Sequence, residues 1–116
     1  MDFISVEQEI ASLSSKLLEL SEKYYEVRCE YGRVKKELYI MLVPVQKIPR
    51  YQKMAVDKQL LTLIDENEEL SEPLTILYQN YILLEQQYKG LEKLIGAYET
   101  KISTLQSLMR WQRDNT

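Results

Sequence analysis

Apolar residues recur at every third or fourth position between residues 74 and 109, and this spacing constrains the fold more than any other feature of the chain. The series is Leu74, Leu77, Tyr81, Leu84, Tyr88, Leu91, Ile95, Tyr98, Ile102, Leu105 and Met109. Alternating steps of three and four residues form the a/d seam of a coiled coil. A helix of this size is roughly 60 Å long at 1.5 Å per residue, so something equally long must lie along its apolar side.

The N-terminal part of the chain has the same spacing. Its apolar positions are Phe3, Val6, Ile10, Leu13, Leu17, Leu20, Tyr24, Val27, Tyr31, Val34, Leu38 and Met41. This second series predicts a helix over about residues 5–42 that packs along the C-terminal helix.

Two prolines separate these helices. Pro44 and Pro49 lack a backbone N–H and disfavour helical geometry in the preceding residue, so we predict a loop over residues 43–50. A new helix can start near Pro49 or Arg50, because proline is tolerated in a first helical turn. This middle helix is predicted over about residues 51–70, with an apolar face of Val56, Leu60, Leu63 and Ile64.

The start of the last helix has two interpretations. Ser71, Glu72 and Pro73 resemble an N-cap followed by a first turn, which predicts a separate helix over about residues 72–113. Alternatively, residues 51–113 form one kinked helix, because the leucines before Pro73 keep the phase of the C-terminal seam.

The charges favour an antiparallel arrangement. The net charge is −4 over residues 1–27, +5 over 28–58, −6 over 59–85 and +2 over 86–116. Antiparallel helices set opposite signs side by side, whereas parallel helices would oppose like signs. The sequence therefore predicts one all-α domain over residues 1–116, a long antiparallel coiled-coil helical hairpin with a shorter middle helix.

Each long helix also carries a second apolar column with a period of seven residues. The first column is Ile4, Ala11, Leu18, Tyr25, Gly32 and Tyr39, and the second is Leu83, Gly90, Ala97, Thr104 and Trp111. Such columns widen the apolar stripe to the width that a helical bundle needs. A second copy of the chain is the simplest cover, so we expect a homodimer. Gly90, Gly96 and Ala97 form a smooth strip where another backbone can approach, or are tolerated surface residues.

Few residues of the chain can carry chemistry. It has no histidine, its only cysteine is Cys29, and its three glycines are scattered within the predicted helices. The usual general base, zinc ligands and phosphate-binding loop are therefore missing, and we expect a non-enzymatic protein without cofactor or metal. A single cysteine suits the reducing cytoplasm, and no apolar run is long enough to span a membrane.

Two groups of residues are candidates for binding. The first is basic and surrounds the proline-bounded loop: Arg33, Lys35, Lys36, Lys47, Arg50 and Lys53. These residues contact nucleic acid or another partner, or they pair with the acidic residues of segment 59–85. The second group is Arg110, Trp111 and Arg113, which with Gly90 and Ala97 can form a partner or oligomer interface. Alternatively, Trp111 only stacks on the N-terminal end of the first helix.

The nine tyrosines are divided by the same spacing. Five of them fall on seam positions, where we expect core packing with a hydrated hydroxyl edge: Tyr24, Tyr31, Tyr81, Tyr88 and Tyr98. The remaining four lie off the seam and are expected to be freer: Tyr25, Tyr39, Tyr51 and Tyr78.

Residues 88–95 (YKGLEKLI) and 101–113 (KISTLQSLMRWQR) resemble short all-helical bacteriophage proteins of Gram-positive hosts. The resemblance covers roughly residues 54–113, and genes of this class tend to lie near single-strand-annealing recombinases and single-strand-binding proteins. It implies a non-enzymatic accessory role in phage DNA recombination or replication, in the cytoplasm of an infected bacterium. That role would be exerted through protein contacts or weak DNA contacts. An inhibitor that occludes a host defence enzyme and a structural coiled-coil assembly factor are the alternatives.

Overall fold

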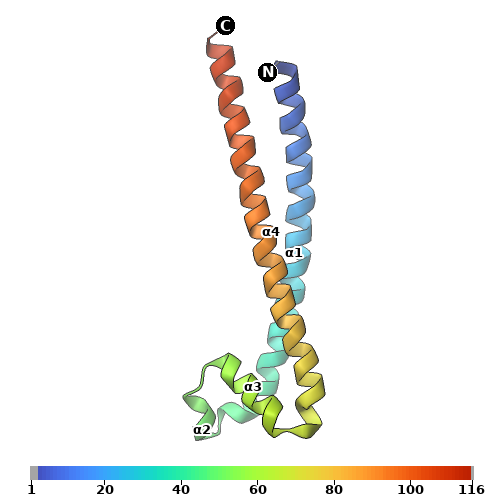
Figure 1. Cartoon of the computed structure of the whole chain (residues 1–116), viewed down its shortest axis with the longest axis vertical. Coiled ribbons are helices and arrows are strands. Elements are labelled where there is room, and N and C mark those ends of the chain that lie inside the picture. The colour runs from blue at the N-terminus through green and yellow to red at the C-terminus, as the bar shows by residue number, and fades with distance from the viewer. Residues whose placement is uncertain (1–2, 116) are drawn as a thin grey trace. The chain divides into compact units, whose positions relative to one another are not determined.

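The structure, a computed structural model, describes residues 3–115, and all regular structure in this range is helical (Figure 1). The helices are α1 (Phe3–Gln46), α2 (Pro49–Gln52), α3 (Val56–Glu66) and α4 (Glu68–Asp114). The side chain of Phe3, the first predicted seam residue, lies outside the described part. The predicted all-α hairpin is confirmed.

The chain divides into two compact units, and α1 and α4 contribute to both. The terminal unit comprises Met1–Val27 and Gln87–Thr116, and the central unit comprises Arg28–Gln86. The prediction of a single domain stays a prediction.

In the terminal unit, α1 and α4 run antiparallel along the predicted seam. Glu9 pairs with Lys101 at 3.5 Å, and the rings of Tyr24 and Tyr88 meet edge to face at 6.5 Å. Residues nearer the N-terminus of α1 thus contact residues nearer the C-terminus of α4, as antiparallel helices require. The buried apolar side chains described in this unit are Val6, Ile102 and Leu105, and its other described seam side chains are only half-buried.

In the central unit, α3 adds a third helix to the core. The buried cluster contains Val34, Leu38, Leu42, Leu60, Leu63 and Leu74, which come from α1, α3 and α4. Val56 and Ile64 pack against this cluster, so the apolar face predicted for the middle helix is confirmed. Each fully buried leucine contributes about 1.5–3 kcal/mol relative to an exposed one.

The first proline does not end α1 where the sequence suggested. The helix passes Leu42 and Pro44 and ends at Gln46, so the predicted loop over 43–50 is corrected to a short turn before Pro49. Pro44 lies in the last turn, where it removes a single backbone hydrogen bond. Leu42 is fully buried and Val45 packs against the core, so packing holds this turn in helical form. Pro49 begins α2, as predicted.

The middle helix is shorter than predicted and is divided. Within the predicted range 51–70, α2 ends at Gln52, α3 extends only from Val56 to Glu66, and α4 already begins at Glu68. Ala55 takes an extended conformation with ψ 153° and precedes α3. The side-chain amide of Gln59 donates to the carbonyls of Tyr51 and Met54 at 2.8 and 3.3 Å. These bonds give both carbonyls a side-chain donor beside the interruption, where the Tyr51 carbonyl also accepts from the backbone N–H of Met54 at 3.0 Å.

The last helix begins at Glu68, which corrects both the predicted start at residue 72 and the single helix over 51–113. Asn67 makes the break with an extended backbone, φ −122° and ψ 99°. Its backbone N–H donates to the Leu63 carbonyl at 3.1 Å, and its side chain reaches the same oxygen at 3.5 Å. Pro73 then falls near the start of α4, where one hydrogen bond is lost, and the neighbouring Leu74 is fully buried.

Candidate protein-binding surface

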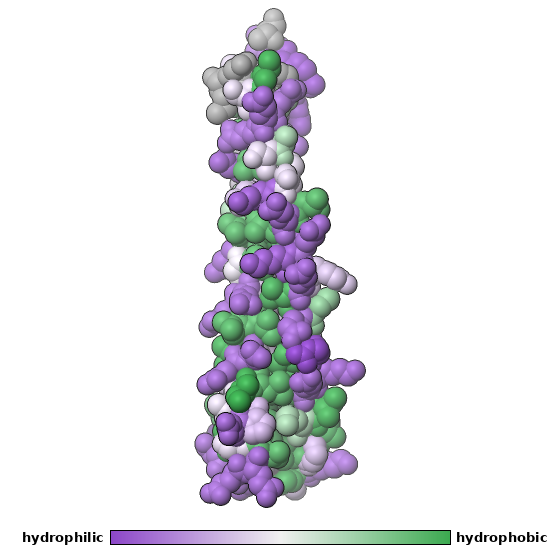
Figure 2. Space-filling view, turned by 90° about the vertical axis from the view of Figure 1, so that its right-hand side faces the viewer, coloured by the Kyte–Doolittle hydropathy of each residue, from purple (hydrophilic) through white to green (hydrophobic). Residues whose placement is uncertain are grey.

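The second apolar column of α1 is exposed in the terminal unit. Ile4 is 60% exposed, Leu18 62% and Tyr25 70%, and Ala11 between them is exposed as well. We call these four residues the α1 column. Hydrophobic atoms also reach the surface among hydrophilic ones on the face drawn in Figure 2. The seam does not account for these side chains, because they lie off its a and d positions.

In this unit, α4 also has a surface that contains its period-seven column. This surface includes apolar residues in addition to those of the column. Gly90, Ala97, Thr104 and Trp111 are all exposed, and Trp111 is 63% exposed. Leu94 and Leu108 lie between them on the same side of the helix, and Leu94 is 44% exposed. Together with Lys101 they form a series that we call the α4 stripe: Gly90, Leu94, Ala97, Lys101, Thr104, Leu108 and Trp111.

The α4 stripe has the spacing of a second coiled-coil seam, with steps of four and three residues throughout. The period of seven residues indicates only Gly90, Ala97, Thr104 and Trp111, and does not include Leu94 and Leu108. The signal was present, because both leucines fall at the intervening steps of the same pattern. The exposure of Trp111 favours the predicted interface role over a stacking cap on α1.

The α1 column and the α4 stripe lie on opposite flanks of the terminal unit. The Glu9–Lys101 pair shows that the side of α1 bearing Glu9 faces the stripe. At about 100° per residue, Glu9 and the α1 column lie on opposite sides of the α1 seam. One contact with a second copy can therefore cover one of these flanks.

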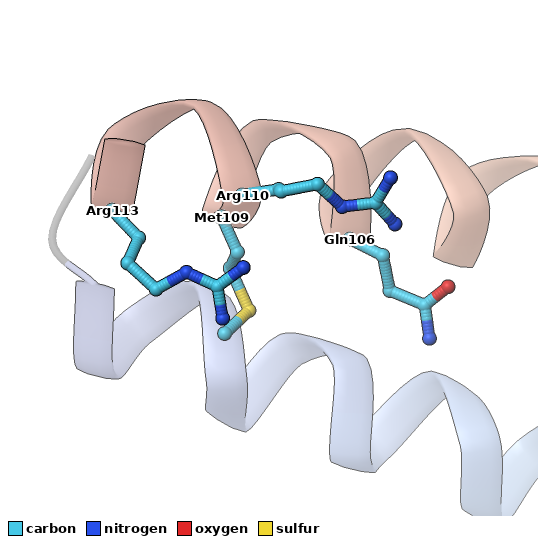
Figure 3. A pocket seen from close by; sticks show the side chains of 4 residues that line it. All are labelled: Gln106, Met109, Arg110 and Arg113. Carbon is cyan, nitrogen blue, oxygen red and sulfur yellow. The ribbon is translucent and has the colours of Figure 1, made fainter. Parts of the chain in front are cut away.

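Two arginines lie beside a hollow near the C-terminal end of α4 (Figure 3). The hollow has a volume of about 280 Å³ and is lined by Gln106, Met109, Arg110 and Arg113. Met109 points toward α1, whereas Arg110 lies along α4. Arg113 is 3.8 Å from its neighbour Asp114. The predicted interface residues Arg110 and Arg113 therefore lie at one end of the terminal unit.

Some residues of the predicted basic group form ion pairs or ring contacts within the central unit. Arg33 forms ion pairs with Glu30 and, at 2.6 Å, with Glu37. The hydrogen bond with Glu30 raises the pKa of Arg33 and lowers that of the Glu30 carboxyl. The Lys35 ammonium lies 5.8 Å from the Tyr31 ring and 5.6 Å from the Tyr39 ring.

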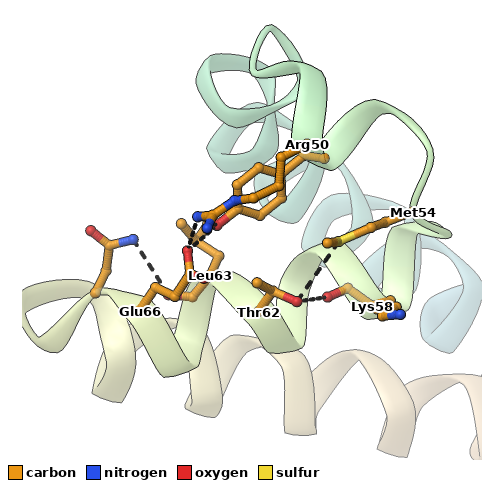
Figure 4. A network of polar contacts seen from close by, with 8 residues as sticks. Arg50, Met54, Lys58, Thr62, Leu63 and Glu66 are labelled. Atoms are coloured by element: carbon orange, nitrogen blue, oxygen red, sulfur yellow. Dashed lines mark hydrogen bonds and ion pairs between the residues drawn. The ribbon is translucent and has the colours of Figure 1, made fainter.

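Arg50 belongs to a polar network between α2 and α3 (Figure 4). It pairs with Glu66, and its guanidinium lies 5.0 Å from the Tyr51 ring. The Tyr51 hydroxyl donates to the same carboxylate at 2.5 Å, and this bond raises the pKa of Tyr51. Tyr51 is only 2% exposed, so the expectation that it is freer was wrong. The pairing of Arg50 agrees with the alternative that this basic group neutralises segment 59–85.

The remaining basic candidates come from different segments of the chain. Lys36 is exposed on α1, Lys47 follows that helix, and Lys53 follows α2. Arg33 and Lys35 are about 200° apart around α1, because each residue turns the helix by about 100°. The structure thus spreads the predicted nucleic-acid group over several segments.

Three further observations bear on function. Within residues 3–115, no cluster of histidine, cysteine and acidic side chains could hold a metal ion. Over the same range, none of the helices combines the length and the apolar character that crossing a membrane requires. No protein-family model, curated protein or solved structure matches the chain.

Proposed function

We propose that the chain is a non-enzymatic helical protein that binds other proteins through the flanks of its terminal unit, and that a second copy of itself is one partner. The observation that carries the proposal is the exposure of large apolar side chains outside the seam. Leu18, Tyr25 and Trp111 are each more than 60% exposed. Extended apolar surface on a soluble protein marks interaction sites.

The half-buried seam of the terminal unit supports the same proposal. A pair of helices covers only one side of each helix, and most helical stability in proteins comes from packing of an apolar face. Leu91 and Ile95 remain half-buried between α1 and α4. Another helix packed on either flank would bury more of these side chains and so would stabilise the unit.

The biological setting of the proposal comes from the resemblance of residues 54–113 to phage proteins. We place the chain as a cytoplasmic accessory protein of a phage DNA recombination or replication module. It acts there by holding a partner protein, and direct DNA contact is at most weak. The division of the basic residues among several segments favours a protein partner over DNA.

Affinity capture from phage-infected cells tests this function. The tagged chain should retain a phage recombination or replication protein. The double variant Leu18→Lys, Tyr25→Lys should lose it, because a partner would have to bury two charges without counterions. Ser15→Lys is the matched control, since it adds one exposed charge to α1 outside the α1 column. Equal capture by all three proteins would contradict a role for this flank.

A further inference from the structure

We infer that the α4 stripe is the surface on which a second copy docks, and that the two stripes pair antiparallel about a two-fold axis near Lys101. This inference rests on the proposed self-association and specifies its geometry. The α4 stripe is a complete seam, with apolar or small residues at every step except Lys101. The α1 column has Glu7, Ser14 and Ser21 at its intervening steps, so it offers only half of a seam.

Side-chain size favours the antiparallel pairing. About an axis near Lys101, Trp111 of one copy faces Gly90 of the other, Leu108 faces Leu94, and Thr104 faces Ala97. Nothing lies within 4 Å of the position that a Cβ of Gly90 would take, so the site has room for an indole. A hollow of about 230 Å³ beside Ala97 and Lys101 offers space for the facing threonine.

The polar groups of the stripe are compatible with a contact at its centre. The Lys101 ammonium already lies 3.5 Å from the Glu9 carboxylate of the same chain. Two such pairs near the axis carry no net charge, so two facing lysines do not repel each other as isolated charges would. The Thr104 hydroxyl donates to the Thr100 carbonyl at 2.9 Å, which leaves its methyl group available for packing.

The other pairing of the same flank is less favourable. Rotation about an axis parallel to the helices would set the α4 stripe against α1 of the second copy. That side of α1 is mainly charged: Glu9, Lys16, Glu19, Lys23 and Glu26. Burying these residues against apolar side chains would remove their hydration without supplying partners.

The size of the flank is close to what a stable dimer needs. The stripe spans residues 90–111, which is roughly 32 Å of helix at 1.5 Å per residue. Two helices about 10 Å in diameter give roughly 600 Å² per copy over that length. Specific interfaces bury about 800 Å² per partner, so the whole flank is required.

Disulfide cross-linking tests the geometry on the full-length chain. All variants carry Cys29→Ser, because the native cysteine is exposed. Lys101→Cys should oxidise to a covalent dimer, since residues on the axis approach their own copies within the range a disulfide requires. Trp111→Cys alone should remain uncrosslinked, but its mixture with Gly90→Cys should form a covalent heterodimer.

The controls distinguish the other outcomes. Ser103→Cys lies on α4 outside the stripe, and Ser14→Cys lies where a dimer through the α1 column would place its axis. Cross-linking through either, or of Trp111→Cys with itself, would overturn the inference. Light scattering on the unmodified chain separates this failure from failure of the proposed function. A dimer without the Lys101 cross-link refutes only the geometry, and a monomer that still captures a phage protein refutes self-association alone.

Discussion

Tyr51 shows how a single side chain can be fixed by contacts that helical spacing does not encode. Its hydroxyl is bound to Glu66, its ring lies beside Arg50, and its carbonyl accepts from Gln59. None of these partners is related to Tyr51 by a three- or four-residue step. Its burial depends on the turn between α2 and α3, and for that reason the sequence pattern could not predict it.

The Tyr51–Glu66 hydrogen bond should make stability depend on pH in the alkaline range. The pKa of Tyr51 is raised in the folded chain, mainly because its hydroxyl donates to the Glu66 carboxylate. The stabilisation is therefore complete below the ordinary tyrosine pKa of about 10 and is lost as the pH rises through the higher folded value. We expect the urea midpoint of the wild type to exceed that of Tyr51→Phe at pH 8, with the difference shrinking above pH ~10.

The other titrating tyrosines and lysines are common to both proteins, so only the difference between their midpoints reports on Tyr51. A difference that stays constant from pH 8 to pH ~11 would contradict the assignment.

At the level of helices, the seams were predictable and the helix ends were not. Every described residue of both predicted seams is buried or half-buried, because a repeat of three and four residues leaves little freedom in which side faces the partner. The prolines were less informative. Pro44 and Pro73 lie inside α1 and α4, where packing of the buried Leu42 and Leu74 outweighs their local preference.

Substitutions in α4 should rank by burial. Leu74→Ala should lower the free energy of unfolding by about 2–5 kcal/mol, because Leu74 is fully buried in the central core. Leu91→Ala should cost roughly 1–2 kcal/mol, since that side chain is half-buried, and Leu91→Asp should cost more because it places a charge in the seam. Leu83→Ala is the control and should change stability by less than about 0.5 kcal/mol.

Urea unfolding followed by circular dichroism measures this series. An effect of Leu91→Ala as small as that of Leu83→Ala would mean that the assigned seam is wrong.

The basic residues near α2 should support only weak DNA binding. Arg33 and Arg50 are exposed but ion-paired with carboxylates, and Lys36, Lys47 and Lys53 are the exposed lysines of the group. Three phosphate contacts give a slope of about −2.7 when log K is plotted against log salt for duplex DNA, because the slope is about −0.9 per phosphate. A fluorescence titration over salt should find a slope no steeper than this, and reversal of the three lysines to glutamate should abolish binding.

Reversal of Lys89 and Lys93 to glutamate is the control, because it changes the charge of α4 outside the basic group near α2, and its DNA binding is compared with that of the first variant. A much steeper slope of log K against log salt in the unmodified chain would show that the paired arginines are released to bind phosphate. DNA would then be favoured over a protein as the main partner.

For the molecule as a whole, burial is uneven between the two units. Among the described side chains, the fully buried apolar ones are Leu38, Leu42, Tyr51, Leu60, Leu74, Val34 and Val6, and all except Val6 belong to the central unit. The central unit has α3 as an additional layer, whereas the terminal unit has only α1 and α4. The terminal unit should therefore gain most from a partner. This difference could not be read from the sequence, because both seams look equally continuous.

Self-association should follow from that imbalance and should depend on the small residues of the α4 stripe. Light scattering at micromolar concentration should give about twice the 13.8 kDa chain mass. The double variant Gly90→Gln, Ala97→Gln should shift the mass toward the monomer, because each side chain would occupy space that the second copy needs. Both positions are exposed within one chain and nothing lies near a Cβ at residue 90, so the variant monomer should fold.

The urea midpoint of the wild type should also rise with protein concentration, whereas that of the variant should not. A wild-type midpoint independent of concentration, together with a monomeric mass, would mean that the exposed columns serve partners other than a second copy.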